Sequence, residues 1–285
     1  MTLLRRLFAL LLLALPLPAA ASPALWKVAD ADTTIYLFGT VHLLPKGEPV
    51  LTGPVKAAFD KSDTLALEVI LPADPRAAAQ VMLKRGIAVG LPPIDQRIDP
   101  ARRSALTASI KRLGLPDAML PNMETWLLAL TLTQAQIVSL GLDADSGVEA
   151  VLRAAAKGKA LVGLETLDQQ LALFDTLPES DQRALLASTV DELSTMQTEL
   201  NEMLASWRSG DTERLGRLIN DDLQASPGLT KTLLVDRNAR FADWVKARLT
   251  TPGTVMLAVG AGHLAGPDSV QAMLARRGLK AERVK

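Results

Sequence analysis

The stretch that decides the fold spans residues 33–42, Thr-Thr-Ile-Tyr-Leu-Phe-Gly-Thr-Val-His. Its first six residues, Thr33 to Phe38, are β-branched or aromatic apart from one leucine, and Gly39 follows them, a pattern that predicts a β-strand. The strand leads directly into Gly39-Thr40-Val41-His42. Open α/β sheets bind ligands beyond the carboxyl ends of their strands, so His42 is a candidate functional residue.

The same arrangement returns near the other end of the chain. There an apolar run from Thr254 to Val259 predicts a strand that ends in Gly260-Ala261-Gly262-His263. Further strands are predicted over residues 64–70, 160–164 and, as an edge strand, 280–284. Helical spacing is found over residues 54–59, 125–140, 148–156, 181–207, 212–223, 230–249 and 268–277. The alternation predicts one α/β domain over residues 22–285.

Between Pro75 and about Met123 the helical pattern is broken repeatedly by glycine and proline. Since proline ends or kinks a helix, this region is expected to form short helices. We therefore predict a helical cap or insertion over residues 75–123.

The first residues carry the pattern of an export signal. Arg5 and Arg6 precede an apolar run from Leu7 to Leu17, and small residues follow up to Ala21. The alternative is a transmembrane anchor, but a spanning helix needs about 20 apolar residues, and this run is shorter and contains Pro16. We expect residues 1–21 to be a cleaved signal peptide and the mature protein to be periplasmic or secreted, with no stable membrane anchor.

Composition limits the chemistry. The formal net charge is zero, which predicts no basic surface for nucleic acid. The chain has no cysteine, so a metal ion must be held by nitrogen and oxygen ligands.

The chain has two histidines, and each lies three residues after a glycine that ends an apolar strand. Glycine lets the backbone turn sharply at little steric cost, so both imidazoles are expected at the carboxyl edge of the sheet. The alternative is that each is an ordinary polar loop residue. Because the matched pattern uses every histidine, we predict that His42 and His263 share one site.

Two glutamates follow the same logic. Glu68 lies inside Leu65-Ala66-Leu67-Glu68-Val69-Ile70, where a carboxylate needs a partner or a metal ion, and Glu165 ends the strand that starts at Ala160. The alternative for both is a structural ion pair with a helix arginine. Arg237 is the corresponding cation, expected either to stabilise substrate charge or to form a salt bridge on a helix surface.

Two imidazoles and one carboxylate leave an open metal position where water can bind and lose a proton near neutral pH. A second carboxylate could accept that proton. The sequence has no His-Glu-x-x-His, so a helical zinc-protease site of the common type is excluded.

Taken together, Tyr36 to Leu43, Leu67-Glu68, Gly163 to Thr166, Arg237-Asn238 and Gly260 to Leu264 resemble the TraB/GumN family, which includes the Tiki proteins. The resemblance spans nearly the whole mature chain. Its specificity lies in the order of the two Gly-x-x-His motifs with the glutamate and the Arg-Asn pair between them.

The resemblance implies that His42, Glu68 and His263 are metal ligands, and it gives Glu68, Glu165 and Arg237 weight as catalytic residues. It also implies an erythromycin-esterase-like or ChaN-like fold, in which a mixed β-sheet is flanked by helices and the site lies at one sheet edge. At Glu149 the chain has glutamate where members often show aspartate, which weakens any role expected of that position.

The first functional hypothesis is an exported hydrolase that depends on a divalent metal ion, Mn, Co or Zn, as Tiki members are described to do, and that cleaves peptide or amide bonds. Its substrate would be a peptide or another small molecule. One alternative is a non-catalytic protein that binds a peptide signal or a haem, with histidine as the haem ligand. A third is a scaffold that uses the 75–123 insertion for partner contact.

Overall fold

The computed structural model describes residues 22–142, 146–224 and 227–284. The signal peptide predicted over residues 1–21 lies outside the described residues. Among the helices that are described, none is both long and apolar enough to cross a membrane.

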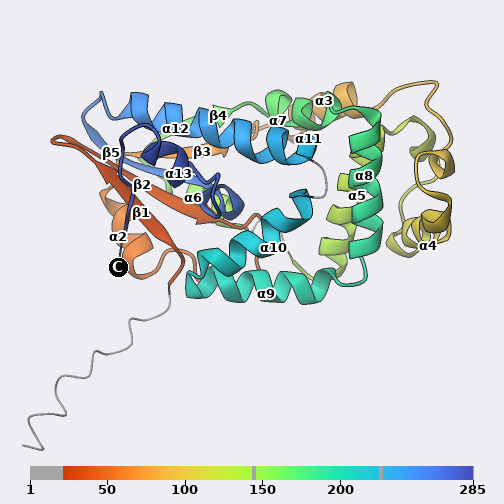
Figure 1. Cartoon of the computed structure of the whole chain (residues 1–285), viewed down its shortest axis with the longest axis horizontal. Coiled ribbons are helices and arrows are strands. Elements are labelled where there is room, and N and C mark those ends of the chain that lie inside the picture. The colour runs from red at the N-terminus through yellow and green to blue at the C-terminus, as the bar shows by residue number, and fades with distance from the viewer. Residues whose placement is uncertain (1–21, 143–145, 225–226, 285) are drawn as a thin grey trace, which may run out of the picture.

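A six-stranded mixed sheet forms the centre of the fold, in the order β4-β3-β5-β2-β1-β6 (Figure 1). Neighbours among β4, β3, β5 and β2 are parallel, whereas β1 is antiparallel to β2 and to β6. The strands span Leu25–Ala29 (β1), Thr33–Thr40 (β2), Thr64–Val69 (β3), Ala160–Glu165 (β4), Gly253–Gly260 (β5) and Glu282–Arg283 (β6). The predicted mixed sheet flanked by helices is confirmed, and β1 is an additional strand that the pattern did not predict.

Strand register brings the carboxyl ends of the parallel strands to one edge. Thr40 of β2 lies opposite Gly260 of β5, and Val69 of β3 lies opposite Glu165 of β4. The segments that follow β2 and β5, and the last residues of β3 and β4, therefore meet at the same edge.

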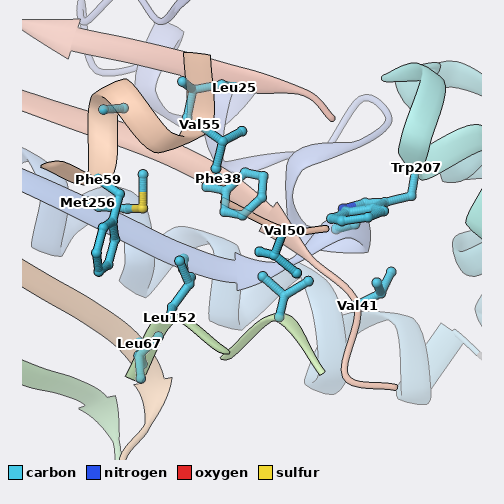
Figure 2. Close-up of a cluster of buried hydrophobic side chains, with 14 of the residues drawn as sticks. Leu25, Phe38, Val41, Val50, Val55, Phe59, Leu67, Leu152, Trp207 and Met256 are labelled. Carbon is cyan, nitrogen blue, oxygen red and sulfur yellow. The ribbon is translucent and has the colours of Figure 1, made fainter. Parts of the chain in front are cut away.

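Both faces of the sheet are covered, as the apolar run of β5 requires. Met256 and Ala258 point to one face and Val255, Leu257 and Val259 to the other, and all five are 0% exposed. On the first face α2 (Gly53–Lys61) and α6 (Val148–Ala155) contribute to the core that Figure 2 shows. On the second face α12 (Asp236–Arg248) and α13 (Val270–Ala275) pack against the sheet.

A helical lobe lies beyond the carboxyl edge of the sheet (Figure 1). As predicted, residues 75–123 form short helices, and they share a core with later helices, where Trp126 stacks on Phe174. The lobe contains α3 (Pro75–Gly86), α4 (Arg103–Leu113), α5 (Thr125–Ser139), α7 (Leu167–Asp175) and α8 (Glu179–Glu192).

From this lobe α9 (Met196–Ser209) leads back to the sheet, and α10 (Thr212–Gln224) then turns away from the sheet and packs along α9 (Figure 1). The predicted helical stretch over residues 181–207 is thus divided between α8 and α9. Trp207, at the end of α9, donates a hydrogen bond from Nε1 to the carbonyl of Gly39 at 2.8 Å. This contact fixes α9 against the first histidine loop.

Candidate functional site

The two histidines lie close together because their strands are neighbours. β2 and β5 pair in parallel with Thr40 opposite Gly260, so the segments that carry His42 and His263 leave the sheet side by side. A Cβ placed on Gly260 would lie 3.7 Å from Nε2 of His42 and 3.6 Å from Cδ2 of His263. Both rings therefore border the small space beside Gly260.

The two strand-end glycines are needed for close packing and not for a turn. The φ angle of Gly260 is −48°, and Gly39 is not among the described glycines with positive φ. A Cβ on Gly39 would lie 3.2 Å from Cα of Ala261, and one on Gly260 would lie 3.2 Å from Oε1 of Glu68. The prediction that glycine eases a sharp turn at these positions is wrong, because both are limited by space.

Arg237, on α12, is the centre of a buried ion-pair network. Its Nη2 donates to Oε2 of Glu68 at 2.5 Å and to Oε2 of Glu165 at 2.7 Å, and its Nε donates to both oxygens of Glu165 at 3.1 and 3.2 Å. The three residues are 7–8% exposed. Glu68 thus has the partner that its burial requires. Arg237 is not the helix-surface residue of the alternative prediction.

Glu165 forms the structural ion pair with a helix arginine that was the alternative prediction for it. Besides Arg237, it accepts hydrogen bonds from Arg240 at 3.0 Å and from Nε2 of Gln170 at 3.3 Å. The same Gln170 amide donates to Glu68 at 3.3 Å. Both oxygens of Glu165 are therefore engaged in holding Arg237 and its neighbours.

The charges of this network stabilise one another. Burial alone would raise the pKa of Glu68, but His263, which is protonated at the low pH where Glu68 titrates, together with Arg237 and His42 outweighs burial and lowers that pKa to about 2. Burial also opposes the charge on Glu165, yet its hydrogen bonds with Arg237 lower its pKa. Burial likewise disfavours the guanidinium of Arg237, but the two carboxylates raise its pKa. All three groups are ionised at neutral pH.

His263 is held as a neutral imidazole with a defined tautomer. Nδ2 of Asn238 donates to the carbonyl of Asp268 at 2.7 Å, which turns Oδ1 of Asn238 toward Nδ1 of His263 at 2.6 Å. Nδ1 must therefore carry the proton, and Nε2 accepts from Nη1 of Arg237 at 2.9 Å. Burial lowers the pKa of His263 to about 4. Phe241 packs edge-on against the ring at 5.2 Å between centroids.

His42 has a different environment. Its side chain is 67% exposed, and its Nδ1 lies 2.8 Å from Oε1 of Glu149. The hydrogen bond with Glu149 raises the pKa of His42 to about 9. Thr40 donates from Oγ1 to the same carboxylate oxygen at 2.5 Å. This arrangement leaves Nε2 of His42 facing the space beside Gly260.

The role of Glu149 in the site was not predicted from the sequence, and the same holds for the contacts of Gln170 and Arg240. The place of Glu149 in the first turn of α6 is where any acidic residue is favoured by the helix dipole, so its position carried no sign of a site. The departure from aspartate was expected to weaken any role of this position, and the structure shows that the glutamate side chain nevertheless reaches His42.

A cavity of about 300 Å³ opens beside these residues. His42, Glu68, Arg237 and His263 line it, whereas Glu165 does not. Its walls come mainly from aliphatic side chains on four helices and on the loop after β2: Leu43, Ile137, Leu200, Met203, Ile219, Leu233 and Leu234. We call this space the apolar cavity.

A π-helical turn shapes the wall next to Arg237. η5 (Lys231–Val235) directly precedes α12, and two of its residues, Leu233 and Leu234, line the apolar cavity. Nη1 of Arg237 also donates to the carbonyl of Leu233 at 3.4 Å. Single π-turns inside helices are frequent at functional sites, and this one places both the cavity wall and the cation.

The donors beside Gly260 suit a divalent metal ion in their chemistry. Each imidazole has its Nδ1 tied to an oxygen acceptor, Glu149 for His42 and Asn238 for His263, which is how metal-ligating histidines are usually oriented. As the side chains stand, however, no group of three or more acidic or histidine residues among those described is arranged to hold an ion. Arg237 occupies Nε2 of His263, so metal binding there requires the guanidinium to move away.

The fold and the site together define the class of protein. It is an α/β protein with a buried cluster of glutamate, arginine and histidine at the carboxyl edge of a mixed sheet. The model of the TraB/PrgY/gumN family matches residues 24–283, and the chain belongs to this family. The resemblance carried by the sequence motifs is thereby confirmed.

The names of three similar proteins assign them no reaction. "Uncharacterized protein YbaP" of Escherichia coli (strain K12) is 24% identical over 258 residues, which cover 88% of this chain and 92% of the relative. "Uncharacterized protein YbaP" of Shigella flexneri is 28% identical over 187 residues, 64% of this chain and 67% of the relative. An "uncharacterized protein" of Treponema pallidum (strain Nichols) is 24% identical over 268 residues, 89% and 80% of the two chains. No solved structure matches the chain.

Proposed function

We propose that this protein is an exported hydrolase of peptide or amide bonds that works with a divalent metal ion. The observation that carries the proposal is the meeting of His42, Glu68 and His263 beside Arg237 in the lining of one cavity. Bond hydrolysis requires an activated water and a group that stabilises the developing oxyanion, and this cluster contains residues suited to both tasks.

His42, Glu68 and His263 are the residues that would hold the ion, through two imidazole nitrogens and a carboxylate oxygen. A divalent ion bound there would supply Lewis-acid polarisation and lower the pKa of water. Gly260 keeps the space between the donors open, since a Cβ would lie 3.2 Å from Glu68 Oε1 and 3.7 Å from His42 Nε2.

The other residues have roles that follow from their contacts. Arg237 carries a positive charge on the cavity wall, and after its guanidinium has left Nε2 of His263 it would be suited to stabilise negative charge that develops on a substrate carbonyl oxygen. Glu165 positions Arg237 and does not reach the cavity. Glu149 holds Nδ1 of His42, so Nε2 is the ring atom left to bind a ligand or exchange a proton.

The proposal is tested by incubating the purified mature protein with a broad peptide library after chelation and after addition of Mn²⁺, Co²⁺ or Zn²⁺. We expect cleavage that needs metal and that is lost in His42→Ala and in His263→Ala. Lys111→Ala on α4, far from the cluster in the helical lobe, is the control and should cleave like the wild type. Metal content measured by mass spectrometry is an independent readout, expected near one ion per chain in the wild type and reduced in both histidine variants.

The outcomes separate the two parts of the proposal. Cleavage that persists after complete chelation would show that no metal ion is needed. The proposal would then be a hydrolase built on His42, Glu149 and Arg237. A library that stays intact with every metal would end the hydrolase assignment itself.

A further inference from the structure

A second cavity, of about 390 Å³, meets the apolar cavity at the candidate catalytic residues. The two cavities share His42 and Glu68 and no other lining residue. A bond positioned at His42 and Glu68 would therefore have one flank in each cavity.

The second cavity is more polar than the first. It is lined by Leu67, Val69, Leu71, Glu149, Ala150, Arg153 and Gln170, together with the shared His42 and Glu68. We call it the polar cavity.

Most charged groups in the two cavities are already paired. Arg237 is held by Glu68 and Glu165, and Glu149 is held by His42 and Thr40. Arg153 differs, because it is exposed and its guanidinium makes no hydrogen bond or ion pair with any residue in the described part of the chain. As far as the described residues go, Arg153 is thus the cation of the polar cavity that is available to a ligand.

The place of Arg153 follows from the helix. Arg153 lies four residues after Glu149 on α6, so both project from the same face about 6 Å apart along the axis. Arg153 is therefore one helical turn along α6 from the glutamate that contacts His42. An arginine at that distance suits a carboxylate, which a guanidinium binds through two parallel hydrogen bonds.

We propose that the site selects a substrate with an apolar side chain on one flank of the scissile bond and a carboxylate on the other. This inference rests on the proposed function. The apolar cavity takes the side chain, and Arg153 binds the carboxylate. The substrate class is therefore a short peptide with an aliphatic residue and either a nearby free C-terminus or an acidic side chain.

The carboxylate preference is tested with three matched peptides that share an aliphatic residue before the scissile bond. One ends in a free carboxylate, one ends in an amide, and one is amidated with a glutamate beside the bond. We expect kcat/KM for at least one carboxylate peptide to exceed that for the neutral peptide by about tenfold or more. The peptide that gains shows whether a terminus or a side chain is recognised.

Arg153→Glu is the decisive variant, and it should abolish or invert the ratio of carboxylate to neutral peptide. Lys157→Glu makes the same charge change four residues later on an exposed residue outside both cavities, so the ratio should stay as in the wild type. A ratio that Arg153→Glu leaves unchanged would overturn the assignment of Arg153.

The apolar flank is tested by replacing the aliphatic residue of the peptide with serine, which should lower kcat/KM by about tenfold or more, because a hydrophobic pocket discriminates single methylenes by such factors. Met203→Gln should reduce the preference for an aliphatic residue over serine more than Met203→Leu does. Both substitutions keep a side chain of similar size, but only glutamine adds polar atoms to the wall of the apolar cavity. Equal effects of the two substitutions would contradict the role of the apolar cavity.

Failure of the proposed function is distinguishable from failure of this inference. If no peptide is cleaved, binding is measured instead. Calorimetry then gives the affinity of N-acetyl-Leu-Glu amide and of N-acetyl-Leu-Gln amide for the wild type, Arg153→Glu and Lys157→Glu. Tighter binding of the glutamate compound that is lost only in Arg153→Glu supports the site without hydrolysis. No difference between the two compounds overturns the inference.

Discussion

Oε1 of Glu149, in the first turn of α6, lies 2.8 Å from Nδ1 of His42, in the loop after β2. This contact joins a helix to a strand end more than a hundred residues earlier in the chain. It also decides which nitrogen of His42 faces the candidate site.

We expect Glu149→Gln to lower activity or metal affinity by about 10- to 100-fold, because residues that orient a histidine ligand have effects of this size. Glu149→Asp, which keeps the carboxylate, should recover part of the loss. NMR titration of the metal-free protein provides a readout that a purely structural role would not change. The pKa of His42, about 9 in the wild type, should fall toward its ordinary value in Glu149→Gln. An unchanged pKa would show that Glu149 does not act on His42.

Arg237→Met should strongly destabilise the fold. The substitution leaves Glu68 and Glu165 buried without their shared partner, which costs about 3–5 kcal/mol of the free energy of unfolding. Arg240 also contacts Glu165 but is 52% exposed, so Arg240→Met should cost only about 0–1 kcal/mol. Urea unfolding at pH 7 measures both. Similar losses in the two variants would show that the buried network is not the stabilising element.

The stability supplied by Glu165 should depend on pH. Its pKa is lower in the folded protein than its ordinary value of 4.5, because Arg237, Arg240 and Gln170 outweigh the effect of burial. A lowered folded pKa means that the stabilisation is complete above 4.5 and is lost as the pH falls through the folded value.

Urea unfolding of Glu165→Gln should therefore show a deficit of about 1–3 kcal/mol at pH 7 that shrinks steadily below pH 4.5. Asp191→Asn, which removes an exposed ion pair with Arg102, is the comparison and should show a small deficit. A deficit in Glu165→Gln that is constant with pH would show that its charge is not the stabilising feature.

Gly260→Ala should fold but lose function. The φ angle of −48° is open to alanine, while the added methyl group would lie 3.2 Å from Oε1 of Glu68. Overpacking of this kind costs about 1–3 kcal/mol of stability. We expect a folded protein with at least about tenfold lower metal occupancy or activity, since the methyl group takes the space between the donors. Thermal unfolding and metal analysis on the same sample test this, and full occupancy would contradict the proposed ion position.

Mass spectrometry of the protein recovered from an exporting host should find a mature chain that begins close to Ala21. The run from Leu7 to Leu17 after two arginines is the pattern of a cleaved signal. Replacing Arg5 and Arg6 with glutamate should reduce export, because the positive end of the signal would be lost. Recovery of the full-length chain with its first residues intact would refute cleavage.

Much of the framework was predictable from sequence because it depends on local pattern. The apolar runs at Thr33, Thr64, Ala160 and Thr254 form strands within two residues of the expected bounds. β1 was missed because its five residues, Leu-Trp-Lys-Val-Ala, include a lysine and are too few to show a period. The π-turn before Arg237 was also missed, since the sequence continues with helical spacing through it.

The sequence by itself determined the strand ends, the two histidines beside them, and the need of Glu68 for a partner. These follow from hydrophobicity, glycine placement and the cost of a buried charge, which act within a few residues. Only the tertiary structure decided that Arg237 is this partner, that Glu149 orients His42, and that strand-end glycines are required by close packing. Those outcomes depend on the parallel pairing of β2 with β5 and on the helices packed beside it, where contacts join residues far apart in the chain.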